Sequence, residues 1–136
     1  MSPRLCFYAP AAALALAVSF SLGVAWSGAS PPAAQLTQAR ADAAQRAFTQ
    51  YELQYKSGIT PLESVYVWSV RWLEAQGGRR GGVGPADDHL KRMQALEATV
   101  KAKVQAGIAS GADTAAAAYY RAEAELWAIE ARGNKP

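Results

Sequence analysis

The sequence has few of the residues from which most catalytic and metal sites are built. It contains one cysteine (Cys6) and one histidine (His89) in 136 residues. A zinc site with several Cys and His ligands and a disulfide within one chain are therefore excluded. A Ser-His-Asp or Cys-His catalytic arrangement would have to use His89, and no convergent catalytic set accompanies it. We expect no enzymatic activity, no cofactor and no metal ion.

The net charge of the chain is also small. The 14 Lys and Arg residues exceed the 11 Asp and Glu residues by only three. Nucleic-acid binding requires cations clustered on one face, which so small an excess does not indicate. No Gly-rich phosphate loop follows a strand pattern, so nucleotide binding has no support either. We expect no nucleic-acid partner.

The first 29 residues have the pattern of an export signal. Arg4 precedes an uncharged stretch over residues 9–22, and the small residues Ser27-Gly28-Ala29 follow. This order is typical of a secretory signal peptide, so we predict cleavage after Ala29 and a periplasmic or secreted protein. The alternative is that residues 5–26 stay in the bilayer as one anchoring helix, and a membrane contact is expected only in that case.

Residues 30–76 predict a first helical hairpin. Its first helix carries an apolar stripe at spacings of four and three residues, made of Ala44, Phe48, Tyr51 and Tyr55, and ends at Gly58. Its second helix is predicted over 62–76, with Thr60 as N-cap, Pro61 as first helical residue and Glu63 completing a capping box. The β-branched and aromatic residues of 64–72 leave a strand as the alternative.

Residues 77–84 include five glycines and predict a flexible hinge, after which residues 85–136 predict a second hairpin. The third helix is expected to start at Pro85 and to end at Gly107, with an apolar stripe of Leu90, Met93, Leu96, Val100 and Val104. The fourth is expected to start near Ser110 or Asp113. The predicted fold class is all-α, with two helical hairpins that form a coiled coil or small bundle. Independent hairpins and one four-helix bundle both remain open.

The fourth helix carries an apolar seam with the 3.5-residue period of coiled coils. The seam consists of Ala112, Ala115, Tyr119, Ala122, Leu126 and Ile129. The bulky Tyr120 and Trp127 lie beside it, so a second helix, from this chain or another, should cover that flank. We expect a protein partner or self-association, with interaction residues Trp68, Trp72, Tyr119, Tyr120 and Trp127.

Three polar groups allow a chemical interpretation, and a structural one is favoured for each. Asp87-Asp88-His89 has metal-binding residue types, but adjacent residues on a helix point in different directions. Arg79-Arg80 could meet anionic groups, although one pair in a glycine-rich segment is typical of a solvated hinge. The carboxylates of Glu123, Glu125 and Glu130 are better explained by an exposed, salt-bridged helix face than by acid–base catalysis.

A weak internal repeat underlies a family resemblance. Residues 56–60 (Lys-Ser-Gly-Ile-Thr) are similar to residues 105–109 (Gln-Ala-Gly-Ile-Ala), and an acidic residue and an Arg follow each copy. Over residues 40–76 and 92–130 this pattern resembles the periplasmic helical hairpins of TolC-like outer-membrane efflux factors, with Gly58 and Gly107 as the helix-turn glycines. No segment has the sequence pattern of the membrane barrel strands of such factors. The resemblance implies a detached hairpin pair that docks tip to tip with a partner.

The predicted export, helical content and length are also similar in architecture to the Spy/CpxP type of small periplasmic helical proteins. Leu36-Thr37-Gln38-Ala39-Arg40 lacks the final Gln of their Leu-Thr-x-x-Gln motif. The sequence therefore predicts an exported, non-enzymatic protein that binds or scaffolds through helix faces, associated with the envelope or with efflux. The alternative is a Spy-like stress chaperone or metal-stress responder, which would show a concave basic surface with exposed aromatic residues.

Overall fold

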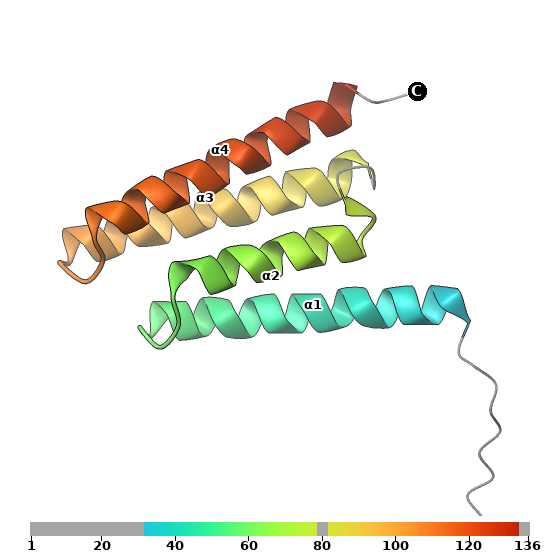
Figure 1. Cartoon of the computed structure of the whole chain (residues 1–136), viewed down its shortest axis with the longest axis horizontal. Helices are drawn as coiled ribbons and strands as arrows, with labels where there is room; N and C mark the ends of the chain where they lie inside the picture. Colours follow the sequence, from blue (N-terminus) through green and yellow to red (C-terminus); the bar gives the residue numbers. More distant parts are fainter. Residues whose placement is uncertain (1–31, 79–81, 134–136) are drawn as a thin grey trace, which may run out of the picture. The chain divides into compact units, whose positions relative to one another are not determined.

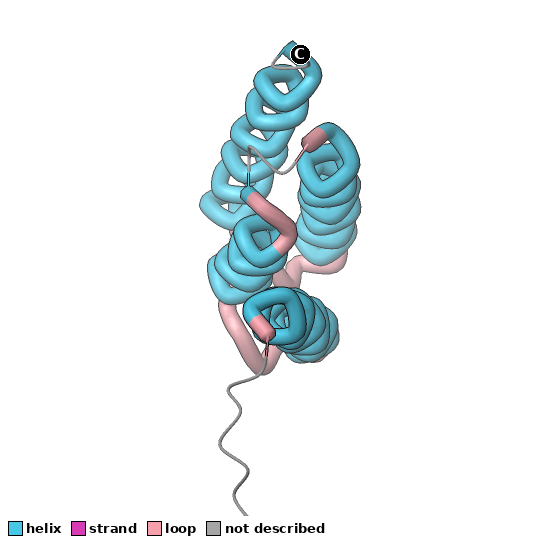
Figure 2. Tube along the Cα trace, turned by 90° about the vertical axis from the view of Figure 1, so that its right-hand side faces the viewer, coloured by secondary structure: helices cyan, strands magenta, loops and turns pink. Residues whose placement is uncertain are grey.

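The computed structural model describes residues 32–78 and 82–133, and its described secondary structure is entirely helical. The helices are α1 (Ala33–Lys56), α2 (Leu62–Ala75), α3 (Val83–Gln105) and α4 (Gly111–Gly133) (Figure 1). Figure 2 shows the same part of the chain as helices joined by loops. The all-α class is confirmed. The predicted signal peptide and Arg79-Arg80 lie outside the described residues.

Residues 64–72 belong to α2, so the strand alternative is wrong. The side chains that α2 buries most deeply are Val65, Ser69 and Leu73, which are 0%, 0% and 1% exposed. Their spacing of four residues follows the helical period, whereas a strand would bury every second residue. Burial along this stripe therefore outweighs the strand propensity of the β-branched and aromatic residues.

The two predicted hairpins share one hydrophobic core. α1 packs along α2 and α3 along α4, while α2 also contacts α3 and, over a shorter stretch, α4. The main core cluster draws residues from all four helices, among them Phe48, Val65, Val100 and Ala124. Residues 31–136 accordingly form one compact unit, as a small bundle does.

The predicted stripes of α1 and α3 face this core. Ala44, Phe48 and Tyr55 of α1 are buried and Tyr51 is half-buried. On α3, Met93, Leu96 and Val100 are buried, while Leu90 and Val104 are partly buried against the core. The prediction omitted Ala86 and His89, which are also fully buried on α3.

Both hairpin turns are built on a glycine in the left-handed region, as predicted. Gly58 has φ 75° and Gly107 has φ 71°. At the end of α1, the Gly58 N–H donates to the Tyr55 carbonyl and the Ile59 N–H donates to the Gln54 carbonyl. At the end of α3, the Gly107 N–H donates to the Val104 carbonyl and the Ile108 N–H donates to the Lys103 carbonyl. This pair of bonds is the Schellman motif, so the two turns are structural repeats of each other.

The two helices that follow these turns begin differently, and the predicted capping box at Thr60 and Glu63 is wrong. Pro61 is the N-cap of α2, with an extended ψ of 156°, and no side chain caps this end. Thr60 therefore lies one residue too early to reach the N–H groups of the first turn. The capping box forms instead at α4, where Asp113 N–H donates to Ser110 Oγ (3.2 Å) and Ser110 N–H to Asp113 Oδ2 (2.8 Å).

The segment between the hairpins is shorter than predicted. α3 begins at Val83 rather than at Pro85, with Gly82 at its N-cap at φ 104°. Pro85 then occupies the first turn, where its missing N–H leaves no helical hydrogen bond unmade. The connection between α2 and α3 therefore runs from residue 76 to residue 82, whereas the prediction placed it at 77–84.

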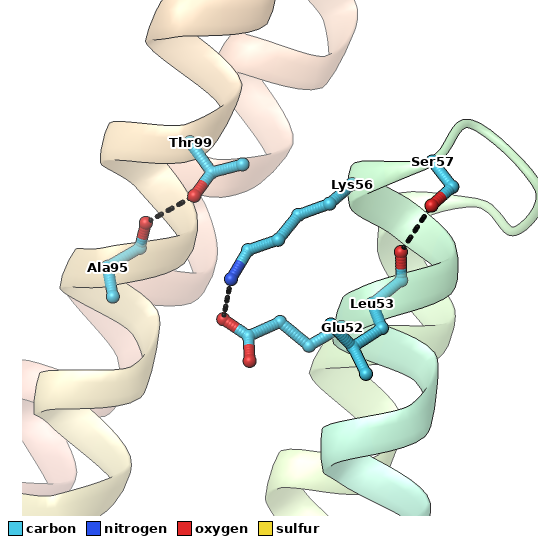
Figure 3. Close-up of polar contacts among 6 residues, drawn as sticks. All are labelled: Glu52, Leu53, Lys56, Ser57, Ala95 and Thr99. Carbon is cyan, nitrogen blue, oxygen red and sulfur yellow. Dashed lines mark hydrogen bonds and ion pairs between the residues drawn. The ribbon is translucent and has the colours of Figure 1, made fainter.

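The exposed polar side chains near the end of α1 bond back to their own helix. Lys56 Nζ lies 2.9 Å from Glu52 Oε1, and Ser57 Oγ donates to the Leu53 carbonyl at 3.0 Å (Figure 3). On α3, Thr99 Oγ1 donates in the same way to the Ala95 carbonyl at 3.0 Å (Figure 3). Such bonds within one helix make these side chains part of a local surface rather than of an interhelical contact.

Candidate functional site: the outer seam of α4

The coiled-coil seam predicted on α4 is exposed along its whole length. Its three large side chains, Tyr119, Leu126 and Ile129, are 61%, 53% and 57% exposed. The other positions, Ala112, Ala115 and Ala122, are exposed as well. We call these six residues the outer seam.

The opposite face of α4 forms the contact with the rest of the bundle. Its buried residues are Ala117, Ala124, Trp127, Ala128 and Ala131. Ala128 and Ala131 pack with Ala86 of α3 in a cluster of small side chains. Alanine at these positions permits a close approach of α3, since no bulky side chain separates the helices. α4 is therefore apolar on both faces, and only one of them is covered.

Of the five aromatic residues predicted to interact, Tyr119 alone lies on the outer seam. Tyr120 is half-buried and stacks on Tyr66 of α2, with ring centroids 4.0 Å apart. Trp127 is buried, and its ring lies 5.4 Å from that of His89. Helices of the same chain therefore cover the flank that holds Tyr120 and Trp127.

The other two aromatics of this set join α2 to α1. Trp68 stacks on Tyr51 with ring centroids 5.9 Å apart, and Trp72 lies 5.8 Å from Phe48. Arg92 of α3 sits over the Trp72 ring at 4.1 Å, a cation–π contact that links α3 to this pair. Trp68 and Trp72 are thus partly buried contacts within the bundle.

Carboxylates flank the outer seam. Glu123 accepts hydrogen bonds from Tyr66 and from Tyr119, the latter at 3.3 Å. Burial, and next the hydrogen bond to Glu123, raise the pKa of Tyr66, so this phenol remains protonated. Glu125 pairs with Arg121 at 2.8 Å, and Arg121 also reaches Glu97 of α3 at 3.0 Å. Tyr119, Ala122, Glu123, Leu126 and Trp127 line a shallow hollow on this face.

A buried polar network lies between α2 and α3. Ser69 Oγ is 2.9 Å from His89 Nδ1, and Arg92 Nε donates to the same oxygen at 2.7 Å. Ser69 and His89 are both fully buried. Burial, and next the nearby charge of Arg92, lower the pKa of His89 to about 4, so its ring is neutral at pH 7. Burial also lowers the pKa of Arg92 to about 10.

This network pairs a serine with a histidine, but its geometry is that of a core contact. Ser69 is 0% exposed, so its Oγ is enclosed in the core. His89 Nε2, the second ring nitrogen, is buried and has no hydrogen-bond partner among the described residues. The sequence pattern did not single out Ser69 or Arg92 as members of this buried network. One feature of the sequence does indicate a buried polar contact: Ser69 lies four residues after Val65 and four before Leu73, within an apolar stripe.

The three residues of Asp87-Asp88-His89 are separated in space. Asp87 pairs with Arg132 of α4 at 2.6 Å, Asp88 pairs with Lys91 at 3.2 Å, and His89 enters the core. Over residues 32–78 and 82–133, no group of three or more His, Cys, Asp or Glu side chains could hold a metal ion. Within the same residues, no helix has the length and apolarity needed to cross a membrane.

The described structure thus defines an all-α protein of four packed helices with one exposed apolar helix face. Comparison with protein-family models, with curated proteins and with solved structures finds no match to this chain.

Proposed function

We propose that this protein is an exported, non-enzymatic helical module that binds or scaffolds another protein through the outer seam of α4. The observation that carries the proposal is a coiled-coil repeat, from Ala112 to Ile129, left uncovered by the chain's own helices. Single exposed apolar residues are ordinary on protein surfaces. An apolar stripe that keeps one helix face over about 25 Å is instead the surface that a partner helix packs against.

The charge around the seam favours helix pairing over the chaperone alternative. A Spy-like chaperone would show exposed aromatics on a basic surface. Tyr119 is the one exposed aromatic side chain among the described residues, and it donates a hydrogen bond to Glu123. Glu125 and Glu130 follow further along α4 and are exposed as well. A flat apolar stripe with acidic flanks suits a helix better than the varied side chains of unfolded clients.

The turn ends of the bundle support the proposed association with envelope or efflux proteins. Lys103, near the end of α3, donates a hydrogen bond to the Tyr55 carbonyl near the end of α1, so both turns lie at the same end. Ile59 and Ile108, which follow the turn glycines, are 75% and 70% exposed there. Two matching apolar tips form a second candidate contact surface of the kind implied by the resemblance to efflux-factor hairpins.

Site-specific photo-crosslinking tests the proposed binding function. A benzophenone amino acid at Leu126 samples the outer seam, and the same group at Gln94 samples an exposed polar position of α3. We expect covalent protein adducts in the producing cell from position 126 and far fewer from position 94. Equal yields at the two positions, or none at either, would contradict binding through the seam.

A further inference from the structure

We propose that the occupant of the outer seam is a second copy of this chain, whose α4 packs antiparallel to the first. The inference rests on the proposed binding function of the seam and names its partner. It follows from the order of large and small residues along the seam. When a second seam runs in the opposite direction, each large side chain of one copy faces an alanine of the other.

In an antiparallel coiled coil, each a position of one helix faces a d position of the other. Setting Tyr119 of one copy opposite Ala122 of the other fixes every other pair. Leu126 then faces Ala115, and Ile129 faces Ala112. Because the same pairs recur about the two-fold axis, each of the three large side chains of either copy meets an alanine. Six layers are filled without a clash between two bulky residues and without a gap between two alanines.

A parallel pair would lack this fit. In register, each large side chain, Tyr119, Leu126 or Ile129, would face its own copy, and alanine would face alanine at the three remaining layers. Such a stack alternates crowded layers with voids, and both cost stability. The sizes of the seam residues therefore specify the direction of the partner helix.

Charge at the flanking positions favours the same direction. In the parallel pair, Glu125 of one copy would lie beside Glu130 of the other, a contact of like charges. In the antiparallel register, the nearest residue opposite Glu125 is Ala118, and the nearest opposite Glu123 is Ala116. Arg132 of each copy comes beside the first turn of the other α4, which carries the acidic residue Asp113.

The bundle leaves this surface accessible to a second copy. Ala117, Ala124 and Ala131, on the face of α4 opposite the seam, are buried within the chain. A single pair of helices covers less than the roughly 1,600 Å² of a standard stable interface, so the dimer should be weak. We expect a dissociation constant on the order of micromolar.

Sedimentation of the full chain over a range of concentrations tests the association. Leu126→Glu should weaken the dimer at least tenfold, because it buries a charge against Ala115 of the partner. Gln94→Glu adds the same charge on the exposed face of α3 and should leave the dimer unchanged. Trp127 is unsuitable for this test because it lies in the core beside His89. Circular dichroism of both variants should match that of the original chain.

Disulfide formation tests the direction of the helices. Cys6 is first replaced by serine. A chain carrying Ala112→Cys should then form a disulfide with a chain carrying Ile129→Cys, but two Ala112→Cys chains should not link to each other. In the antiparallel register, two copies of residue 112 lie about 25 Å apart along the helix axis. Self-linking of the Ala112→Cys chain would overturn the antiparallel arrangement.

The outcomes separate this inference from the proposed function. A chain that is monomeric at up to hundreds of micromolar, while position 126 crosslinks to a different protein, would overturn the homodimer and leave the binding function standing. A monomeric chain without adducts at position 126 would contradict both. Equal weakening by Leu126→Glu and Gln94→Glu would also overturn the assignment of the interface to the seam.

Discussion

His89 Nδ1 lies 2.9 Å from Ser69 Oγ, and both side chains are fully buried where α2 meets α3. Arg92 binds the same oxygen, so the junction between the two hairpins contains a polar network in an otherwise apolar core. A buried polar group is stable only while its hydrogen bonds are kept. Alternative packings of one hairpin on the other would break these bonds, which favours a single arrangement.

The neutral ring of His89 makes the stability of the protein depend on pH. Its pKa is about 4 in the folded protein and 6.5 ordinarily, so the unfolded chain binds the proton more tightly. The stability contributed by the neutral ring is present above pH 6.5 and is lost as the pH falls from 6.5 to 4. We expect the free energy of unfolding to fall by roughly 3 kcal/mol over this range. Urea denaturation at a series of pH values measures it.

His89→Gln provides the control for this pH dependence. The amide does not titrate, so the fall between pH 6.5 and 4 should be much smaller in this variant, although its stability at pH 7 is lower than that of the original chain. An equally steep fall in both proteins would show that other groups cause it.

The turn glycines are required for their backbone conformation alone. A Cβ at Gly58 or Gly107 would meet no atom within 4 Å, but both residues have φ near 70°. Alanine at either position should therefore cost about 1 kcal/mol through backbone strain. Gly84 has equally open surroundings inside α3 and no positive φ, so Gly84→Ala should be neutral or slightly stabilising. Thermal denaturation distinguishes these results, and a loss at Gly84 as large as at Gly58 would contradict them.

The difference between the two N-caps predicts unequal effects of matched substitutions. Ser110→Ala removes the side chain that accepts the Asp113 N–H and should cost about 1 kcal/mol. Thr60→Ala, one residue before the N-cap of α2, should change stability by less than about 0.5 kcal/mol because no side chain caps that helix. Chemical denaturation of the two variants decides the matter. Equal costs would mean that Thr60 also caps a helix in solution.

The glycine-rich segment predicts the first site of proteolysis. Residues 77–84 contain five glycines and the dipeptide Arg79-Arg80, which provides trypsin sites. Brief digestion should cut here first and release two fragments, each containing one hairpin, as mass spectrometry can show. First cleavage at an arginine or lysine inside a helix would contradict this prediction.

The sequence by itself determined the helices and the glycine turns that end α1 and α3, because both depend on neighbours along the chain. The stripe of Ala44, Phe48 and Tyr55 recurs at the helical period, and Gly58 and Gly107 supply the backbone freedom that a helix stop requires. The same local reasoning placed the N-cap of α2 at Thr60 rather than Pro61, since the backbone angle of a proline fits both positions.

Only the tertiary structure decided which apolar face of α4 is covered. Both faces of α4 repeat every seven residues, one through Ala117, Ala124 and Ala131 and the other through Ala112, Tyr119 and Leu126. Periodicity alone therefore does not indicate which face is buried. Packing selects the face that lets α3 approach closely and that buries Trp127 against His89. The contact of Ser69 with His89 and Arg92 likewise joins residues 20 and 23 positions apart on different helices. No periodicity within one helix records such a contact, because it depends on how α2 and α3 pack.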